Sequence, residues 1–126
     1  MTQFASPRIA STADLASFTG AELTHVHVWK TGVMLSFNDE PRTLTIEGGA
    51  ELRAQGRVES YNQEIVVALG ARVLSLIGRC VLDARATDDR IFSLAFDDGT
   101  ILTLQPDGSG YECYNVNLPD GAVFAG

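Results

Sequence analysis

The sequence Ile91-Phe-Ser-Leu-Ala-Phe-Asp-Asp-Gly-Thr-Ile-Leu-Thr-Leu104 decides the fold of this chain. Two runs of alternating apolar residues flank Asp97-Asp98-Gly99-Thr100. Asp-Gly between such runs favours a tight primed turn, because that turn needs positive φ at its centre. The stretch therefore predicts a β-hairpin over Ile91–Leu104. It is informative about structure and carries no catalytic motif.

This hairpin has a counterpart in the first half of the chain. Shifted by 58 positions, Ala13–Gly20 falls on Ala71–Gly78, with identical residues at the positions of Ala13, Ser17 and Gly20. With one extra residue in the intervening turn, Val33–Ile46 repeats the strand-turn-strand pattern of the hairpin. We interpret this as a duplicated helix–strand–strand–strand unit within a single domain, residues 1–126. The repeat units span roughly 11–61 and 66–121.

The remaining elements follow from periodicity and turn residues. A capping box at Ser11 predicts a short helix that ends at Gly20. Helical spacing of apolar residues predicts a second, largely buried helix within Glu64–Ile77. Strands are expected over 22–29, 33–37, 44–46, on both sides of Asp97-Asp98, and over 111–116, while 51–61 is polar enough for an edge strand or a loop. The predicted fold class is α+β: two antiparallel β-meanders related by a pseudo-two-fold axis, packed with a central helix and a short N-terminal helix.

Charge limits the partners of the chain. It has 126 residues and a formal net charge of −7. Acidic residues gather between 83 and 120, at Asp83, Asp88, Asp89, Asp97, Asp98, Asp107, Glu112 and Asp120, against Arg85 and Arg90. Such a surface repels phosphate backbones, so nucleic-acid binding is disfavoured and a basic protein partner is compatible. The alternative is that the acid only keeps a small protein soluble.

Cysteines and the N-terminal sequence favour the cytoplasm. Cys80 and Cys113 are the only cysteines, and no Cys-x-x-Cys spacing exists. Met1–Ala10 has no apolar run long enough for export or for spanning a membrane. We therefore expect a cytoplasmic protein with two free thiols and no membrane association. A Cys80–Cys113 disulfide is the alternative.

The second half contains Phe96-Asp-Asp-Gly-Thr100, Tyr111-Glu-Cys-Tyr114 and Pro119-Asp-Gly121. With these motifs it resembles a family of short bacterial single-domain proteins of unknown function. In those domains a Phe-Asp-Asp-Gly-Thr hairpin is followed by a closing Tyr-Glu-x-aromatic strand and a Pro-Asp-Gly-like turn. Phe96–Thr100, Tyr111–Tyr114 and Pro119–Gly121 match these motifs, with Tyr114 where the family more often has Trp. Some of these small acidic proteins look like immunity proteins, which neutralise a toxin by direct binding. The resemblance covers roughly residues 74–121 and implies that role by analogy alone.

His25, His27 and Trp29 share one face of the strand predicted within Glu22–Trp29. Because tryptophan is favoured in interface hot spots, this patch is the first candidate for a binding surface, beside the equivalent positions Asp83 and Arg85. The alternative is that Trp29 folds over the hairpin end and completes the core. Metal binding is disfavoured because a metal needs three or four ligands and these are the only histidines.

The acidic pairs are better explained by turns than by chemistry. Asp88-Asp89 and Asp97-Asp98 bracket one strand and would lie about 30 Å apart by strand rise. That separation excludes a paired-carboxylate acid/base site in this hairpin, and neither pair has calcium-loop spacing. With the His-Trp patch, the residues assigned to partner binding are Asp88, Asp89, Asp97, Asp98, Glu112 and Tyr114.

The sequence favours a non-catalytic protein-binding domain without a cofactor. It has no Gly-x-Ser-x-Gly elbow, no cysteine–histidine signature and no phosphate-binding glycine loop in a strand-to-helix context. Immunity against a basic toxin domain is the expected role, with the protein a monomer or a homodimer. The alternative is a structural or self-associating domain that pairs through an exposed edge strand, Arg57–Tyr61 or Tyr111–Val116.

Overall fold

The computed structural model describes residues 8–9, 15, 18–38, 42–87, 91–105, 114–118 and 122–125. The elements, in chain order, are β1 (Arg8–Ile9), β2 (Leu23–Trp29), β3 (Gly32–Phe37), β4 (Arg42–Ile46), β5 (Ala50–Ala54), β6 (Arg57–Tyr61), η2 (Gln63–Ile65), α2 (Val66–Val73), η3 (Leu74–Leu76), β7 (Val81–Ala86), β8 (Phe92–Phe96), β9 (Ile101–Leu104), β10 (Tyr114–Asn117) and β11 (Ala122–Ala125).

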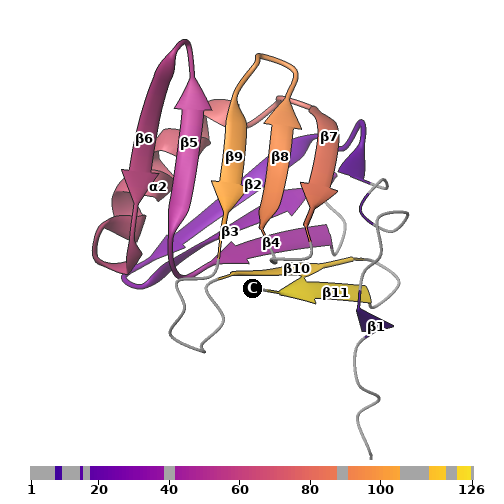
Figure 1. Ribbon diagram of the computed structural model, residues 1–126, viewed down its shortest axis with the longest axis horizontal. Coiled ribbons are helices and arrows are strands. Elements are labelled where there is room, and N and C mark those ends of the chain that lie inside the picture. Colours follow the sequence, from indigo (N-terminus) through magenta and orange to yellow (C-terminus); the bar gives the residue numbers. More distant parts are fainter. Residues whose placement is uncertain are drawn as a thin grey trace, which may run out of the picture.

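The strands form two sheets. One has six strands in the order β1-β11-β10-β4-β3-β2, and the other has five in the order β6-β5-β9-β8-β7. Neighbouring strands are antiparallel except for the parallel pair β1 and β11. Figure 1 shows the five-stranded sheet in front of the six-stranded sheet, with the strands of the two sheets running crosswise. The α+β class and the two meanders, β2-β3-β4 and β7-β8-β9, are as predicted.

Each meander is completed by a hairpin from the other half of the chain. The β5–β6 hairpin, from the first half, pairs through β5 with β9. The β10–β11 hairpin, from the second half, pairs through β10 with β4. The prediction of Tyr111–Val116 as an exposed edge is therefore wrong, because β10 lies between β4 and β11. Arg57–Tyr61 does form an edge strand, β6.

The turn between β8 and β9 differs from the predicted primed turn. The Phe96 N–H donates to Thr100 O at 2.8 Å, and the Gly99 N–H donates to Phe96 O at 3.0 Å. Among the residues of this turn only Gly99 has positive φ, +90°. The loop therefore has three residues with glycine in the left-handed position, the usual alternative to a two-residue loop. Asp98 does not have positive φ, and its Oδ1 accepts the Thr100 N–H at 2.9 Å.

A two-residue turn with positive φ at both centres occurs instead between β5 and β6. Gln55 has φ +52° and Gly56 has φ +76°. Gln-Gly is a weaker turn signal than Asn-Gly or Asp-Gly, so the sequence does not decide between an edge strand and a loop over 51–61. The structure makes it a hairpin in which β5 is internal.

The second helix is buried on one side only. Asn62 caps η2, since its Oδ1 accepts the N–H groups of Glu64 at 2.9 Å and Ile65 at 3.3 Å. The buried side chains of α2 are Val66, Leu69, Gly70 and Val73, and the exposed apolar ones on this segment are Ile65, Val67, Leu74 and Ile77. The prediction of a largely buried helix is wrong, because the helix lies at one side of the sheets, against β2, β3 and β6 (Figure 1).

The predicted N-terminal helix falls mostly outside the described residues. Leu15 has helical backbone, and 18–20 form a turn. The side chains of Leu15 and Phe18 are buried in the core. The Phe18 ring packs edge-on against Phe37, with ring centroids 5.3 Å apart, and against Phe92 at 6.1 Å. Buried residues of both halves therefore belong to one hydrophobic cluster.

The two sheets meet where β2 and β7 begin, through hydrogen bonds that recur in both halves. The Gly20 N–H donates to Val81 O at 2.7 Å, and the Gly78 N–H donates to Leu23 O at 2.8 Å. Gly20 and Gly78 have φ of +85° and +93°, a region that favours glycine. Each member of these pairs lies 58 positions from its counterpart.

Two turn side chains support this junction in the same way. Asn38 Oδ1 accepts the Glu22 N–H at 2.8 Å, and Asp97 Oδ2 accepts the Cys80 N–H at 3.2 Å. In return the N–H groups of Asn38 and Asp97 each donate to the carbonyl of the same partner at 2.9 Å. Glu22 and Cys80 themselves form an isolated antiparallel bridge between the sheets.

Candidate functional site

The outer surface of the six-stranded sheet carries no Asp, Glu, Lys or Arg among its described side chains on β2, β3, β4 and β10. His25, Ser36, Thr43 and Asn117 form one cross-strand row, and His27, Met34, Thr45 and Asn115 form the next. Trp29 lies opposite Gly32 in a third row. We call this surface the uncharged face; its residues are His25, His27, Trp29, Met34, Ser36, Thr43, Thr45, Asn115 and Asn117.

The two histidines lie together on this face, as strand alternation predicts. Their rings stack with centroids 6.3 Å apart at an interplanar angle of 22°, and both side chains are exposed. His25 Nδ1 lies 3.2 Å from Thr24 Oγ1. Across the described part of the chain, no three His, Cys, Asp or Glu side chains gather where they could hold a metal ion. The two histidines therefore contribute a polar, partly aromatic patch to this face.

Trp29 is both packed and exposed. An added Cβ on Gly32 would lie 2.4 Å from Trp29 Cζ2 and 2.6 Å from Cε2, so the indole lies directly over the glycine. Trp29 nevertheless remains 39% exposed. The indole thus folds over the hairpin end and still presents surface to solvent.

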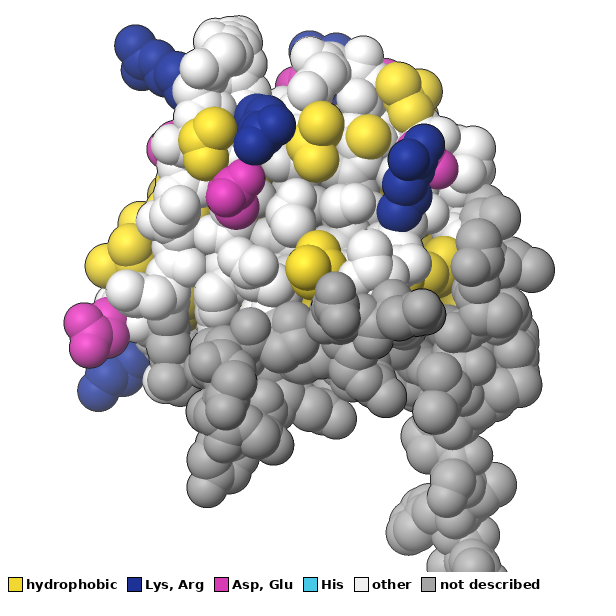
Figure 2. Space-filling model, viewed as in Figure 1, with side chains coloured by type: hydrophobic (Ala, Val, Ile, Leu, Met, Phe, Trp, Pro, Cys, Tyr) yellow, Lys and Arg dark blue, Asp and Glu magenta, His cyan; other side chains and the backbone are white. Residues whose placement is uncertain are grey.

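The corresponding surface of the five-stranded sheet is charged. Its outer side chains include Glu51, Arg53, Asp83 and Arg85, and Arg85 pairs with Asp83. Figure 2 looks onto this surface, where basic, acidic and hydrophobic side chains are interspersed. The expectation that Asp83 and Arg85 lie beside the His-Trp patch is wrong, because β2 and β7 belong to different sheets.

The other predicted partner-binding residues divide into three groups. Asp97 and Asp98 are exposed, but their carboxylates already accept hydrogen bonds within the fold, and Asp97 also lies 3.9 Å from Arg79. Asp88, Asp89 and Glu112 lie outside the described residues. Tyr114 is 2% exposed and stacks on Phe92 in the core, so its assignment to a binding surface is wrong. It follows the inward alternation of β10.

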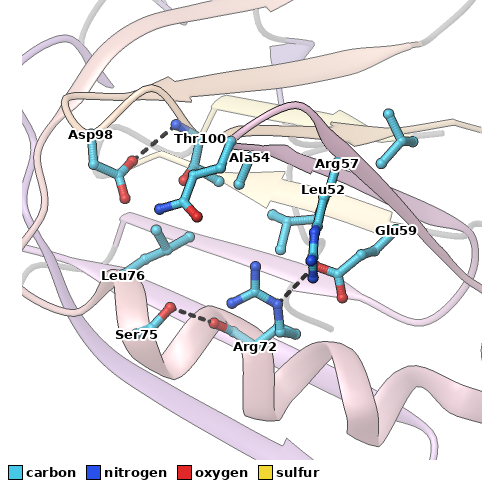
Figure 3. A pocket seen from close by; sticks show the side chains of 11 residues that line it. Leu52, Ala54, Arg57, Glu59, Arg72, Ser75, Leu76, Asp98 and Thr100 are labelled. Carbon is cyan, nitrogen blue, oxygen red and sulfur yellow. Dashed lines mark hydrogen bonds and ion pairs between the residues drawn. The ribbon is translucent and has the colours of Figure 1, made fainter.

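A pocket of about 580 Å³ lies between the β5–β6 hairpin, the end of the second helix and the β8–β9 turn (Figure 3). Its lining residues are Leu52, Ala54, Gln55, Arg57, Val58, Glu59, Arg72, Ser75, Leu76, Asp98 and Thr100. Leu52, Leu76 and Thr100 are buried, and the charged groups stand around them. No local sequence pattern predicts this pocket, because its walls come from three separate segments.

Two lining residues of the pocket, Glu59 and Arg72, belong to a hydrogen-bonded trio with Tyr61. The Arg72 Nε–H donates to Glu59 Oε1 at 2.9 Å, and the Tyr61 hydroxyl donates to Glu59 Oε2 at 2.8 Å. The Tyr61 hydrogen bond, followed by Arg72, lowers the pKa of Glu59. Burial, followed by the Glu59 hydrogen bond, raises the pKa of Tyr61. The same carboxylate raises the pKa of Arg72. Glu59 is therefore held as a carboxylate.

Sequence reasoning missed this trio although a signal was present. Arg57, Glu59 and Tyr61 alternate along β6 and so share one side of the strand, turned toward the helix. Arg72 is a polar residue next to the buried stripe of α2. A polar strand face and a polar helix flank predict a pocket only when the two elements are known to be neighbours.

Comparisons of the chain with models of known protein families, with curated proteins and with solved structures find no match. In the described parts of the chain, no helix has both the length and the apolar character needed to cross a membrane.

Proposed function

We propose that this chain is a non-catalytic protein-binding domain and that the uncharged face is its contact surface. One observation carries the proposal: a sheet surface of nine described side chains without an Asp, Glu, Lys or Arg, on a chain of net charge −7. Interface cores are depleted of charged residues and enriched in aromatic residues and Met. Trp29 and Met34 supply those types here.

The contrast with the other sheet supports this choice. His25 and His27 occupy the positions that correspond, 58 residues on, to Asp83 and Arg85. The two sheets share their strand pattern, so folding alone does not require one outer surface to lack charge. The difference is explained if the uncharged face is covered by a partner.

The proposal extends to a role for that partner. We propose that the domain is an immunity protein of the bacterial cytoplasm that neutralises a basic toxin domain. Its resemblance to short bacterial domains of this kind and its net charge of −7 support the extension. Opposite charge accelerates encounter, while the uncharged face forms the contact. We therefore expect association with the toxin to slow as salt is raised.

Site-specific photocrosslinking in the native host tests the proposal. A photoreactive residue replaces Met34 on the uncharged face or, as the matched control, Ser93, which has the same place in the other meander. We expect one discrete protein adduct from Met34 and none from Ser93. Equal adducts from both positions, or none from Met34, would contradict a partner on this surface. Co-expression with the product of a neighbouring toxin gene then tests the immunity role.

A structural, self-associating domain is the second candidate. It is favoured by β6, an edge strand of the five-stranded sheet, on which Val58 is exposed. Edge strands with unpaired backbone groups can pair between copies. Arg57 on the same strand opposes such pairing through its charge. Light scattering at working concentration separates the candidates, because a strict monomer excludes this one.

We propose that the architecture arose by duplication of a helix–strand–strand–strand unit. The support is the recurrence of the same junction hydrogen bonds at offsets of 58 or 59 positions, Gly20 with Gly78 and Asn38 with Asp97. A register irregularity also recurs, after Leu23 in β2 and after Val81 in β7. On this view the first unit includes a short N-terminal helix, equivalent to the end of the second helix.

A further inference from the structure

We propose that the pocket beside β6 binds a compact zwitterion, with a carboxylate at its arginine side and an ammonium group at Asp98. This goes beyond protein binding through the uncharged face, which lies on the other sheet. Figure 3 shows the guanidinium groups of Arg57 and Arg72 next to Glu59 at one side of the pocket, and Asp98 at the opposite side. The pocket is therefore polarised from one side to the other.

The arginine side suits a carboxylate. Glu59 engages Arg72 only through Nε, and the terminal Nη groups of Arg72 point into the pocket (Figure 3). Arg57 forms no hydrogen bond or ion pair with the rest of the described chain. After the Tyr61 and Arg72 hydrogen bonds, its charge is a smaller cause of the lowered pKa of Glu59. Two guanidinium groups against one carboxylate leave one positive charge uncompensated. Guanidinium forks match carboxylate geometry.

The opposite side suits an ammonium group. Asp98 uses Oδ1 to accept the Thr100 N–H, and its Oδ2 has no partner within the described residues. Ser75 Oγ donates to Arg72 O at 2.8 Å, which leaves the lone pairs of this hydroxyl as acceptors. Asp98 would repel a dianion such as phosphate, so the charge pattern favours a monocarboxylate with a cationic end.

The floor and the size of the pocket suit a short carbon chain between these ends. Leu52 and Leu76 are buried beneath the charged groups, and Ala54 lies beside them. A volume of about 580 Å³ is within the range of small-molecule sites. The ligand class that fits is therefore an ω-amino carboxylate, with methylene groups over the apolar floor.

Titration of the full chain, followed by amide chemical shifts in NMR, tests this assignment. The probes are glycine, β-alanine, 4-aminobutyrate and 6-aminohexanoate, each compared with the unsubstituted carboxylate of equal length. We expect saturable shifts at Gln55, Ser75 and Thr100, at concentrations on the order of 1–10 mM for ligands this small. One amino carboxylate should bind at least fivefold more tightly than its plain analogue.

Three variants make the test specific. Arg57→Gln should weaken binding of the best probe at least tenfold. Asp98→Asn keeps the Oδ1 that caps Thr100, and it should reduce the amino carboxylate to the affinity of its plain analogue. Arg53→Gln, on the outer side of β5, should change neither. The proposal is overturned if no probe saturates, if amino and plain carboxylates bind equally, or if Arg57→Gln and Arg53→Gln behave alike. None of these outcomes bears on the uncharged face.

Discussion

At the scale of single residues, Asn38 and Asp97 perform the same task in the two halves. Each side chain accepts one backbone N–H at the junction of the sheets, Asn38 from Glu22 and Asp97 from Cys80. An amide oxygen and a carboxylate oxygen are interchangeable in this role. The role of these two residues therefore follows from their equivalent positions in the two halves, and not from the charge of the side chain.

Asp97→Asn should consequently be tolerated, with a change in unfolding free energy of no more than about 0.5 kcal/mol. Its ion pair with Arg79 is long and exposed, so losing it costs little. Asp97→Ala should cost about 1 kcal/mol through the lost hydrogen bond. Asn38→Ala should cost about 1 kcal/mol more than that, because Asn38 has φ +56°. Urea unfolding measures all three, and equal costs for Asp97→Asn and Asp97→Ala would contradict the assigned role.

Glu59 gives a prediction about pH. The Tyr61 hydroxyl and then Arg72 lower the pKa of Glu59 in the folded chain. The stability that this carboxylate contributes is present above its unfolded pKa, about 4.3, and is lost as pH falls through the lower folded pKa. Tyr61→Phe should raise the pKa of Glu59 in a ¹³C NMR titration of its carboxyl group. Arg53→Gln is the control and should leave that pKa unchanged; no difference between the two variants would refute the Tyr61 contact.

The alternation of residues along the strands predicts correctly which side of the sheet some side chains occupy, and wrongly for others. It placed His25, His27 and Trp29 together on an outer face, because β2 is a regular strand beyond its first residues. Tyr114, a predicted partner-binding residue, is instead buried in the core. Alternation reports two faces of a strand, and which face is buried depends on whether the strand is internal.

At the scale of elements, Gly70 permits close packing of α2 on the first meander. An added Cβ at this position would lie 2.6 Å from Val28 Cγ2 and 3.3 Å from Val33 Cγ2. From the sequence alone, the glycine only weakened the case for a helix. The structure gives it a packing role that helix propensity cannot reveal.

Gly70→Ala should therefore destabilise the protein by about 1–2 kcal/mol, since overpacking outweighs the gain of about 1 kcal/mol in helix propensity. Introducing Gly70→Ala into a Val28→Ala background should cost much less, because the closest methyl group is then absent. A double-mutant cycle by chemical unfolding measures this coupling. A stabilising Gly70→Ala, as at an ordinary exposed helix position, would contradict the close packing.

At the scale of the whole molecule, the halves are interlocked by exchanged hairpins. β5 and β6 extend the sheet of the second meander, and β10 and β11 extend the sheet of the first. The sequence predicted both meanders because their strands are joined by short loops. It could not predict the exchange, since strand periodicity is the same whichever strand lies alongside.

Because of this exchange, fragments 1–61 and 62–126 should not fold alone. Each fragment lacks a hairpin that extends its meander and part of the shared core. Mixed in equal amounts, they should reassociate and restore a dispersed amide NMR spectrum. A dispersed spectrum from either fragment by itself would show that the halves are independent.

The pocket also depends on the fold of the whole molecule, because its lining residues come from distant segments of the chain. Arg57, Arg72 and Asp98 come from a hairpin, a helix and a turn that only the tertiary fold brings together. No local pattern could have grouped them. By contrast, the uncharged face consists of neighbouring strands. The alternation of residues in β2 alone predicts that His25, His27 and Trp29 share this face.

The central claim is that the uncharged face binds a protein, and its most direct test is a charge placed on each sheet in turn. The measurement is the dissociation constant for the partner captured through Met34, using Met34→Arg and the matched variant Ser93→Arg. A buried, unpaired charge at an interface core is costly, so Met34→Arg should weaken binding at least 100-fold. Ser93→Arg should change it less than threefold. Equal effects of the two variants, or a larger effect of Ser93→Arg, would contradict the claim.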